Sequence, residues 1–537
     1  MNTRKRTRAL LFLVLAYPVI LPAPTQAGSE ETPRPAPGPL AIVVKEVPRP
    51  KEVLGWGSPV FSPDGEWLTV QFVPAVPGDQ SKAPALMEHG TEIKTGQEAV
   101  TRRGFQVGLV REDGTGFKCL TCNQERKAGR PIWFPDGKAF LFQTGYGVNN
   151  LFYVYDLTTR KAYPLKGVNS ERRLVQNRFE MISPDGKKLC WTKVWLDGFH
   201  IVMGDLVKKG DRWRVEEVRE IYPRLIADPS DPDQWAWALA WYENKDFTDG
   251  GRTLVFSGSR DQGGNLDDYL LDLETGEVKR LTTHREWDEG GEFSPDGRWW
   301  VFETTRAHEV LSVFANVPLP AFMDWVLVAP ITAATLIGQW FAPHEPFLLD
   351  RWGDRRDYIG QRLHAAGDQD WAIRGGVHWH PGGRKIVWGE LLGQEMRDSR
   401  ILVGEFTGLE PGPALARVPT ATPEWAPLLK DAPLRPLRVR QSLKGKFSGT
   451  ADLDFKGRLI RGKYRVVFKD YSADGEYILN GFMSLQVKWV GVAHLQGDIQ
   501  LSGQHSGFVK MDLNISNQKV SGQAVSEKDG QRFEKHF

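Results

Sequence analysis

Short apolar runs along this chain alternate with turns that are rich in proline, aspartate and glycine. The clearest turn is Ser62-Pro63-Asp64-Gly65, which lies between the apolar runs 57–61 and 67–72. In such a turn proline fixes φ at a corner position, aspartate accepts hydrogen bonds from the following backbone, and glycine supplies a positive φ. The pattern therefore predicts a tight turn that joins two β-strands.

The same turn returns along the chain, each time between two apolar runs. Aligned on the turn, the copies lie at residues 57–65, 129–137, 178–186, 289–297 and 375–383, and a degenerate copy starts at Trp237 and reaches its turn at Asp249 and Gly250. The run after each turn is β-branched and aromatic, and in the clearest copies a third run ends in Asp-Leu and a fourth follows. Four strands per copy is the composition of a propeller blade.

Six copies predict an all-β fold with a six-bladed propeller, and a seven-bladed propeller with one blade that lacks the motif is the alternative. Residues 40–45 are strand-like and precede the first copy. They are placed to complete the last blade and to close the ring, which removes the open edge of a linear array.

These segments resemble the WD40-like (PD40) repeats of the TolB-like β-propeller family, which also occur in the propeller domains of prolyl-oligopeptidase-like enzymes. The resemblance covers residues 40–420 and is clearest in the turn and in the second strand. It implies a propeller fold, and a fold alone does not specify a function.

Composition adds two constraints. The 537 residues are 41% hydrophobic and carry a net charge of +2, so the chain can bury a large core and has no charge bias toward nucleic acid. The 20 Trp and 55 Gly fit many short strands and turns that are packed by aromatic side chains.

The first 27 residues have the order of a secretory signal peptide. Basic residues at 4–8 precede an apolar run at 9–21 and a small-residue cleavage site at 25–27. This order predicts a periplasmic or secreted protein. An uncleaved anchor is the alternative, which the short run and Pro18 disfavour. Residues 28–39 are rich in proline and glutamate and are expected to be disordered.

Two insertions interrupt the repeat. Residues 73–103 lack periodicity, and we expect a loop over one face. Residues 314–343 contain an apolar run at 325–337 that is too short to span a bilayer. We expect a hairpin or short helix that packs across the propeller or the neighbouring domain. The alternative is an exposed flap that contacts a membrane surface or a hydrophobic partner.

Prolines accumulate after the last copy and predict an extended linker at residues 421–440. The strand-like runs 464–469, 476–482 and 509–515 follow, and the last alternates strictly between apolar and polar residues. Residues 441–537 are therefore predicted to form a separate small antiparallel β domain, a curved sheet or partial barrel.

The chain has three cysteines, Cys119, Cys122 and Cys190. Because an exported protein can form disulfides, Cys119 and Cys122 are a candidate pair. A redox pair would be expected at the start of a helix, and zinc would need more than two thiolates. Cys190 lies in a predicted strand and is expected to be a small buried residue.

Familiar catalytic motifs are absent from the sequence. It contains no Gly-x-Ser-x-Gly elbow, His-Glu-x-x-His helix, P-loop or dinucleotide fingerprint. The segment after the propeller is too short and too β-rich for the hydrolase domain of the peptidase relatives, so a serine peptidase is disfavoured.

Equivalent positions of a repeat form rings around the channel of a propeller, so departures from the pattern indicate a site. Three positions before the proline, Val60, Ile132 and Met181 are apolar, whereas two neighbouring copies carry Glu292 and His378. Polar residues also precede these copies, and a histidine replaces the serine of the last turn. The candidate ligand-binding set is His284, Glu286, Asp288, Glu289, Glu292, Arg374, His378 and His380.

Two functional hypotheses follow. The first is an exported, non-catalytic scaffold of the cell envelope that engages a protein, glycan or small ligand at the channel mouth, with membrane contact through 314–343 and no nucleic acid. In its simplest form Glu292 and His378 only hold two blades together. The second is a metal-dependent carbohydrate-active enzyme that resembles the oligogalacturonate lyases. That resemblance implies a general base and a divalent metal held by His284, Glu292, His378 and His380.

Overall fold

The computed structural model describes residues 35–537 apart from 76–103, 123–126, 145–150, 169–173, 196–197, 211, 224–225, 227, 310, 328–343, 356, 366–370, 393–397, 433–437, 459–460, 490–491 and 517–518. The predicted signal peptide, residues 28–34, most of the first insertion and the second half of the apolar insertion lie outside these residues. The chain from Pro39 to Phe537 forms one compact unit. Within the described residues, no helix has the length and apolar character that a membrane span requires.

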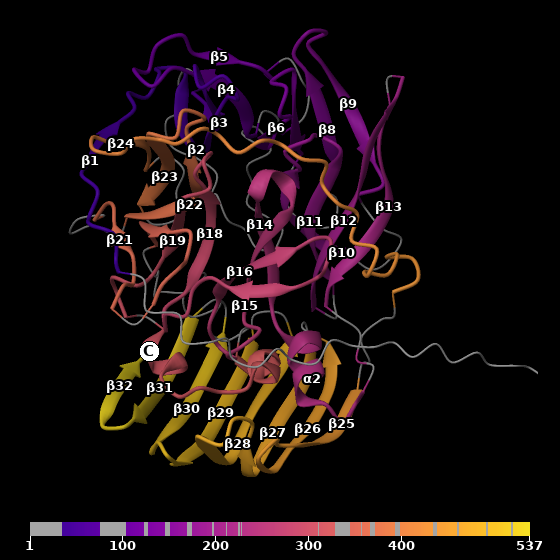
Figure 1. The fold of residues 1–537 in the computed structure, drawn as a ribbon, viewed down its shortest axis with the longest axis vertical. Coiled ribbons are helices and arrows are strands. Elements are labelled where there is room, and N and C mark those ends of the chain that lie inside the picture. Colours follow the sequence, from indigo (N-terminus) through magenta and orange to yellow (C-terminus); the bar gives the residue numbers. More distant parts are fainter. Residues whose placement is uncertain are drawn as a thin grey trace, which may run out of the picture. The chain divides into compact units, whose positions relative to one another are not determined.

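The unit begins with antiparallel sets of four strands (Figure 1). The first set contains β2 (Val53–Phe61), β3 (Leu68–Pro74), β4 (Gln106–Val110) and β5 (Lys118–Cys119), and the second contains β6 (Gly129–Trp133), β7 (Ala139–Gln143), β8 (Phe152–Asp156) and β9 (Lys161–Lys166). The third contains β10 (Leu174–Ile182), β11 (Lys188–Trp195), β12 (Gly198–Lys209) and β13 (Arg212–Tyr222), and the fourth contains β14 (Tyr242–Thr248), β15 (Thr253–Gly258), β16 (Asp267–Asp272) and β17 (Val278–Arg280). The fifth contains β18 (Asp288–Phe293), β19 (Trp299–Thr304), β20 (Glu345–Asp350) and β21 (Gln361–Arg362), and the last contains β22 (Trp371–Trp379), β23 (Lys385–Leu392), β24 (Ser399–Phe406) and β1 (Ile42–Glu46).

The pairing of β1 with β24 joins the start of the unit to the last set, as predicted for residues 40–45. A short parallel pairing of β13 with β9 also merges two neighbouring sets into one sheet. The first strands of successive sets contact one another in a closed cycle that runs through β2, β6, β10, β14, β18, β22 and back to β2. Four-stranded sets around a closed cycle of innermost strands form a β-propeller.

The repeated turn has the predicted chemistry. Gly65 has φ of +74° and donates its N–H to the carbonyl of Ser62 at 2.8 Å. The carboxylate of Asp64 accepts the Ser62 hydroxyl at 2.5 Å and the N–H of Glu66 at 3.0 Å. The same contacts recur at Ser183 and Asp185, so one local sequence closes the first two strands of several sets.

The C-terminal residues form one eight-stranded antiparallel sheet in sequence order (Figure 1). Its strands are β25 (Arg438–Lys444), β26 (Ser448–Arg458), β27 (Arg461–Ser472), β28 (Tyr477–Trp489), β29 (Val492–Gly503), β30 (Gly507–Ser516), β31 (Lys519–Lys528) and β32 (Gln531–His536). In β30 alternate residues such as Met511 and Leu513 are buried, whereas Lys510 and Asp512 are exposed. The sheet therefore has one apolar face, as the alternation predicts.

The described part of the apolar insertion covers that apolar face. It contains α3 (Ser312–Ala315) and the short 3-10 helix η2 (Ala321–Met323), and its side chains share one core with the C-terminal sheet and with α2 (Pro232–Leu239). The Phe322 ring lies 6.3 Å from the ring of Phe468 and 6.0 Å from that of Tyr471, centroid to centroid. These residues therefore pack against the neighbouring domain, which is the first of the two interpretations given above.

The proline-rich segment before the C-terminal sheet is bound to the propeller rather than free. The N–H of Gly412 donates to Asp296 at 2.7 Å, and that of Val418 donates to the carbonyl of Gly250 at 2.9 Å. Farther along, the N–H of Thr420 donates to Asp185 at 3.1 Å. We call residues 410–429 the strap, because it crosses the turns of three successive sets.

Candidate functional site

Every innermost strand of the propeller carries a β-bulge at the same place. The register shifts fall between Gly57 and Val60, Gly129 and Ile132, Arg178 and Met181, Asn244 and Asp246, Glu289 and Gly291, and Ile373 and Val377. Several bulge residues have positive φ, among them Ser58 (46°), Arg130 (50°) and Phe179 (52°). Because a bulge redirects side chains and twists the strand, this ring sets which residues line the channel.

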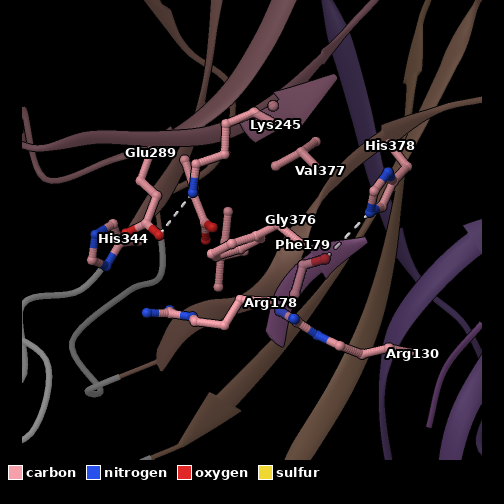
Figure 2. A pocket seen from close by; sticks show the side chains of 14 residues that line it. Arg130, Arg178, Phe179, Lys245, Glu289, His344, Gly376, Val377 and His378 are labelled. Carbon is pink, nitrogen blue, oxygen red and sulfur yellow. Dashed lines mark hydrogen bonds and ion pairs between the residues drawn. The ribbon is translucent and has the colours of Figure 1, made fainter. Parts of the chain in front are cut away.

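Two adjoining cavities of about 130 and 320 Å³ are lined by these bulges. Figure 2 shows the smaller one. Both are lined by Arg130, Phe179, Lys245, Gly291, Gly375 and His378. The larger cavity adds an apolar wall that includes Val60, Ile132 and Met181. Its size is in the range of cavities that bind small ligands.

Phe179 lies among three cations between the cavities (Figure 2). Its ring centroid is 3.7 Å from Nζ of Lys245, 4.8 Å from Cζ of Arg178 and 5.0 Å from Cζ of Arg130. A cation over an aromatic face is attracted by the ring quadrupole. These contacts hold a non-glycine residue in a left-handed backbone conformation that is unfavourable without support.

Lys245 is fully neutralised by carboxylates. Its ammonium lies 2.9 Å from Glu243 and 3.0 Å from Glu289, and Glu243 also pairs with Arg178 at 2.9 Å. Burial opposes the charge of Lys245, but the two carboxylates outweigh it and raise the pKa of the ammonium. The predicted ligand residue Glu289 thus lines the smaller cavity and is already paired.

Glu292 and His378 meet across two sets of strands. Nδ1 of His378 lies 3.3 Å from Oε2 of Glu292, and the same oxygen accepts the N–H of Trp379 at 2.9 Å. Both side chains line the larger cavity and remain about one third exposed, at 29% for His378 and 34% for Glu292. They join neighbouring sets and also stay accessible to a ligand.

Asp246 also lines the larger cavity. Its carboxylate accepts the N–H of Phe247 at 2.7 Å and that of Phe293 at 3.1 Å. Burial, and then the charge of Glu292, raise the pKa of Asp246 well above its usual value. The larger cavity therefore contains two carboxyl groups that repel each other.

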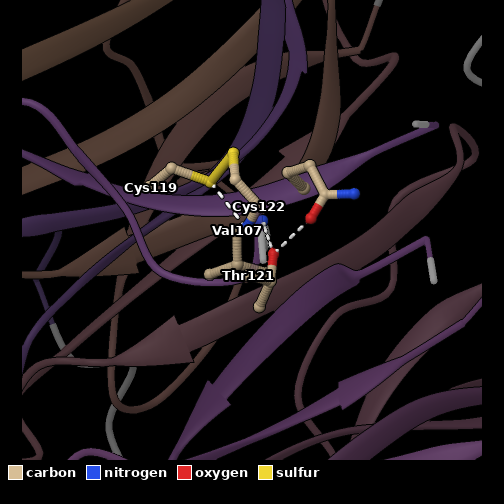
Figure 3. The surroundings of a disulfide bond; sticks show 5 residues. Val107, Cys119, Thr121 and Cys122 are labelled. Carbon is tan, nitrogen blue, oxygen red and sulfur yellow. Dashed lines mark hydrogen bonds between the residues drawn. A yellow bond between two sulfur atoms is a disulfide. The ribbon is translucent and has the colours of Figure 1, made fainter. Parts of the chain in front are cut away.

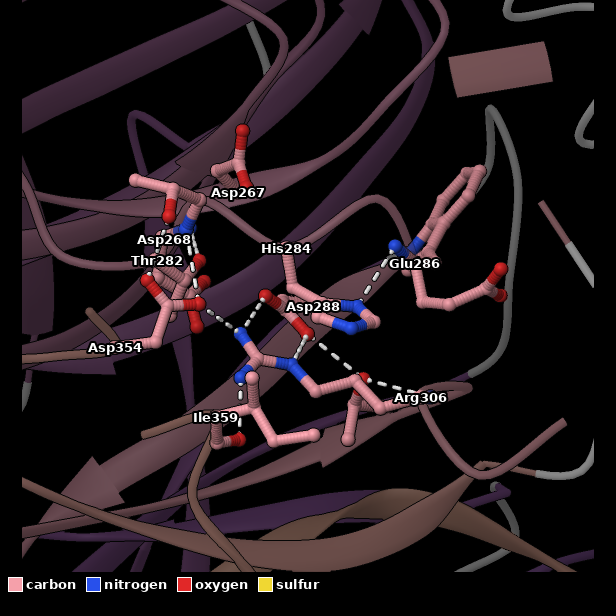
Figure 4. Close-up of polar contacts among 12 residues, drawn as sticks. Asp267, Asp268, Thr282, His284, Glu286, Asp288, Arg306, Asp354 and Ile359 are labelled. Atoms are coloured by element: carbon pink, nitrogen blue, oxygen red, sulfur yellow. Dashed lines mark hydrogen bonds and ion pairs between the residues drawn. The ribbon is translucent and has the colours of Figure 1, made fainter. Parts of the chain in front are cut away.

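Three further predicted ligand residues, His284, Glu286 and Asp288, do not line these cavities. Glu286 is 0% exposed and accepts the N–H and hydroxyl of Ser312 at 2.8 and 2.7 Å and the Thr305 hydroxyl at 2.8 Å. His284 accepts the N–H of Glu286 at 3.1 Å (Figure 4). The prediction placed them at the channel mouth. In the structure Glu286 instead holds residues 311 and 312, directly before the apolar insertion.

Asp288 belongs to a buried ion network around Arg306 (Figure 4). Nη2 of Arg306 lies 2.5 Å from Asp288 and 2.7 Å from Asp354, and its Nη1 donates to the carbonyl of Ile359 at 2.6 Å. The side chains of Arg306 and Asp288 are both 0% exposed. The network is therefore structural, since no ligand can reach these two groups from solvent.

The remaining predicted residues are His380 and Arg374. Nε2 of His380 lies 3.2 Å from the carbonyl oxygen of Gly65, and Nδ1 accepts the N–H of Gly382 at 2.8 Å, so this ring links two turns. The side chain of Arg374 lies outside the described residues. No three His, Cys, Asp or Glu side chains in the described part of the chain gather as metal ligands. The predicted metal set of His284, Glu292, His378 and His380 is therefore not brought together.

Asp268 lies next to this network and should make the stability of the protein depend on pH. Its carboxyl accepts the Ser257 hydroxyl at 2.6 Å and is fully buried. Burial, and then the charge of Asp288, raise the pKa of Asp268 to about 7 from 3.8. The folded state thus holds this proton more tightly than the unfolded chain, so the contribution of Asp268 to stability is full below pH 3.8 and is lost as the pH rises to about 7.

We expect Asp268→Asn to remove this loss, because the amide stays neutral. The free energy of unfolding of the variant minus that of the native protein should rise between pH 4 and 7, by about 1.4 kcal/mol per unit of pKa shift. Urea unfolding across this range measures this difference, with Asp498→Asn, at a half-exposed aspartate, as the matched control. A difference that is flat with pH would show that Asp268 is ionised in the folded protein.

Cys119 and Cys122 form a disulfide bond (Figure 3). The N–H of Cys122 donates to Sγ of Cys119 at 3.0 Å. Between them Thr121 is fully buried, accepts the N–H of Val107 at 2.9 Å and donates to Gln106 at 2.7 Å. The bond therefore secures the end of the first four-stranded set, whereas Cys190 is a buried free thiol.

No family model matches the sequence. The protein Atu1656 of Agrobacterium fabrum (strain C58 / ATCC 33970), which is uncharacterized, is 33% identical over 94 residues, or 18% of this chain and 29% of that protein. The structure is similar to that of TolB from Acinetobacter baumannii, with 17% identity, a TM-score of 0.35 and 56% and 60% of the two chains covered.

Two further solved structures are similar at the same level. A putative TolB from Agrobacterium tumefaciens has 14% identity, a TM-score of 0.34 and coverage of 55% of this chain and 95% of that chain. An oligogalacturonate lyase in complex with manganese has 13% identity, a TM-score of 0.37 and coverage of 69% and 97%. At these identities and TM-scores the matches assign no function to this chain.

Proposed function

We propose that this protein is an exported, non-catalytic β-propeller of six blades that binds a small ligand in its central channel. The observation that supports this most is the larger cavity of about 320 Å³, where bulged innermost strands bring charged and apolar side chains together. Polar groups that converge in a mainly apolar cavity are typical of ligand sites. The six copies of the repeat and the closed cycle of first strands support the blade count.

Export is proposed from two independent features. The first 27 residues have the order of a signal peptide. The disulfide between Cys119 and Cys122 fits an oxidising compartment such as the periplasm. A place in the cell envelope follows as part of the proposal.

The alternative of a metal-dependent carbohydrate-active enzyme has less support. It needs His284 and His380 beside Glu292 and His378. In the structure His284 instead accepts the N–H of Glu286, and His380 links two turns. Of the four predicted metal ligands, Glu292 and His378 line the larger cavity and the other two do not. Two such groups suit hydrogen bonding to a ligand.

Filling the cavity should abolish ligand binding. Val60→Trp places a large ring in the larger cavity, so compounds that raise the melting temperature of the native protein should no longer raise that of the variant. Differential scanning fluorimetry with a library of small polar metabolites measures this. As a control, Val43→Trp changes a 46% exposed valine of β1 and should keep the native response.

If the stabilising compounds act equally on Val60→Trp, the channel is not their site. If no compound stabilises the native protein, the proposal of a small ligand fails.

A further inference from the structure

The larger cavity contains a cation that the fold does not pair. Within the described part of the chain, the Arg130 guanidinium makes no ion pair with a carboxylate; it contacts the ring of Phe179 at 5.0 Å. Its backbone N–H donates to Gln71 at 3.0 Å. Burial raises the pKa of the Glu180 carboxyl and outweighs the charge of Arg130, which lowers it. A guanidinium has five donors, so Arg130 offers a fork that suits a carboxylate.

The same cavity holds more carboxyl groups than this cation can balance. Glu180 is 4% exposed, lines the cavity, and has one carboxyl oxygen without a hydrogen-bond partner. Among the described residues, Asp246 accepts hydrogen bonds from backbone N–H groups alone, and Glu292 lies close enough to repel it. Lys245 cannot balance the charge of these carboxyl groups, because its ammonium is already paired with Glu243 and Glu289.

These groups lie in one cavity of about 320 Å³, with Arg130 on β6, Glu180 on β10, Asp246 on β14 and Glu292 on β18. A ligand that satisfies all of them must present an anionic group to Arg130 and a cationic group to the carboxylates. Asp246 and Glu292 form a pair of carboxyl groups that suits an organic ammonium with its three N–H donors. A metal ion fits less well, because no three described His, Cys, Asp or Glu side chains gather as ligands. The remaining wall, with Val60, Ile132 and Met181, suits an apolar side chain.

We propose that the larger cavity binds a zwitterion of amino-acid size, with its carboxylate on Arg130 and its ammonium on Asp246 and Glu292. This inference rests on the proposed ligand-binding function and names the class of ligand. Burial, and then the charge of Glu292, raise the pKa of Asp246, and a bound ammonium would favour its charged form and so recover part of this cost.

Isothermal titration calorimetry with three probes on the full chain tests the charge pattern. L-leucine carries both charges, N-acetyl-L-leucine only the anion, and L-leucinamide only the cation. L-leucine is expected to bind roughly tenfold or more tightly than either of the others, because each loses a charge-assisted hydrogen bond. Equal binding of N-acetyl-L-leucine would show that the carboxylates are unused, and equal binding of L-leucinamide would show that Arg130 is unused; either result overturns the proposal.

Variants locate each charge. Arg130→Gln should weaken L-leucine roughly tenfold and leave L-leucinamide unchanged, whereas Asp246→Asn should weaken both and leave N-acetyl-L-leucine unchanged. The exposed Arg214→Gln and the half-exposed Asp498→Asn are matched controls outside the cavity that should not change the binding of any probe. If Arg130→Gln and Asp246→Asn weaken all probes alike, the charges do not act in the proposed way and the inference is wrong.

The result also separates the two proposals. If L-leucine does not bind but other compounds do so in a manner that Val60→Trp abolishes, the zwitterion is wrong and the channel site stands. If nothing binds, both fail.

Discussion

Replacing Arg306 with leucine is expected to lower the free energy of unfolding by about 3–5 kcal/mol, the usual cost of leaving buried charges without their partner. Arg306 holds both Asp288 and Asp354, and its side chain is 0% exposed. Without it the two carboxylates would face each other in the interior with no cation between them. Chemical unfolding, followed by tryptophan fluorescence, measures the loss.

The matched control is Arg214→Leu, which removes an exposed arginine whose contact with Glu216 is 3.9 Å long. A change below about 1 kcal/mol is expected there. Adding Asp288→Asn and Asp354→Asn to Arg306→Leu should recover part of the loss, because the uncompensated charge is removed. If Arg306→Leu costs no more than the control, the buried network does not hold the propeller together.

Replacing Phe322 with alanine should destabilise the chain by a comparable amount, about 3–5 kcal/mol, through the cavity it leaves. The ring is 1% exposed and packs against Phe468 and Tyr471 of the C-terminal sheet. Because the core is shared, the loss should appear in the C-terminal sheet as well as in the insertion. Hydrogen exchange of the β27 amides, together with urea unfolding, measures both.

Phe447→Ala is the matched control, since this phenylalanine is 67% exposed. It should change the free energy of unfolding by less than about 0.5 kcal/mol. If Phe322→Ala leaves the exchange of β27 unchanged, the insertion and the C-terminal sheet fold independently and the shared core is not cooperative.

Most of the fold could be predicted from the Pro-Asp-Gly repeat in the sequence. The Pro-Asp-Gly turn depends on three adjacent residues, so its chemistry is readable without any tertiary contact, as the hydrogen bonds of Asp64 show. The alternation of β30 predicted its buried face for the same reason. The strap was harder to predict, because proline composition indicates an extended chain but not the surface that it binds.

The candidate site was predicted only in part. Glu292 and His378 were found because they depart from an apolar ring, and both line the cavity. The sequence analysis missed Arg130, Phe179 and Lys245. Their orientation depends on bulges, which shift the register of a strand, so that alternation along the sequence no longer predicts which side chains face the channel. The small residues Gly57, Gly129, Gly290 and Gly375 before the turns were the one available signal for those bulges.

The contacts of the strap lead us to expect an order of folding during synthesis. Its N–H groups bind acceptors at Asp296, Gly250 and Asp185, which belong to the fifth, fourth and third sets. These acceptors are in place only when the corresponding turns have formed, and the ribosome releases the strap after all of them. We therefore expect the strap to bind the propeller after these three sets have folded and before the C-terminal sheet, which is synthesised last, is complete. A circular permutant that opens the chain at the strap should thus reach the same fold more slowly than the native chain.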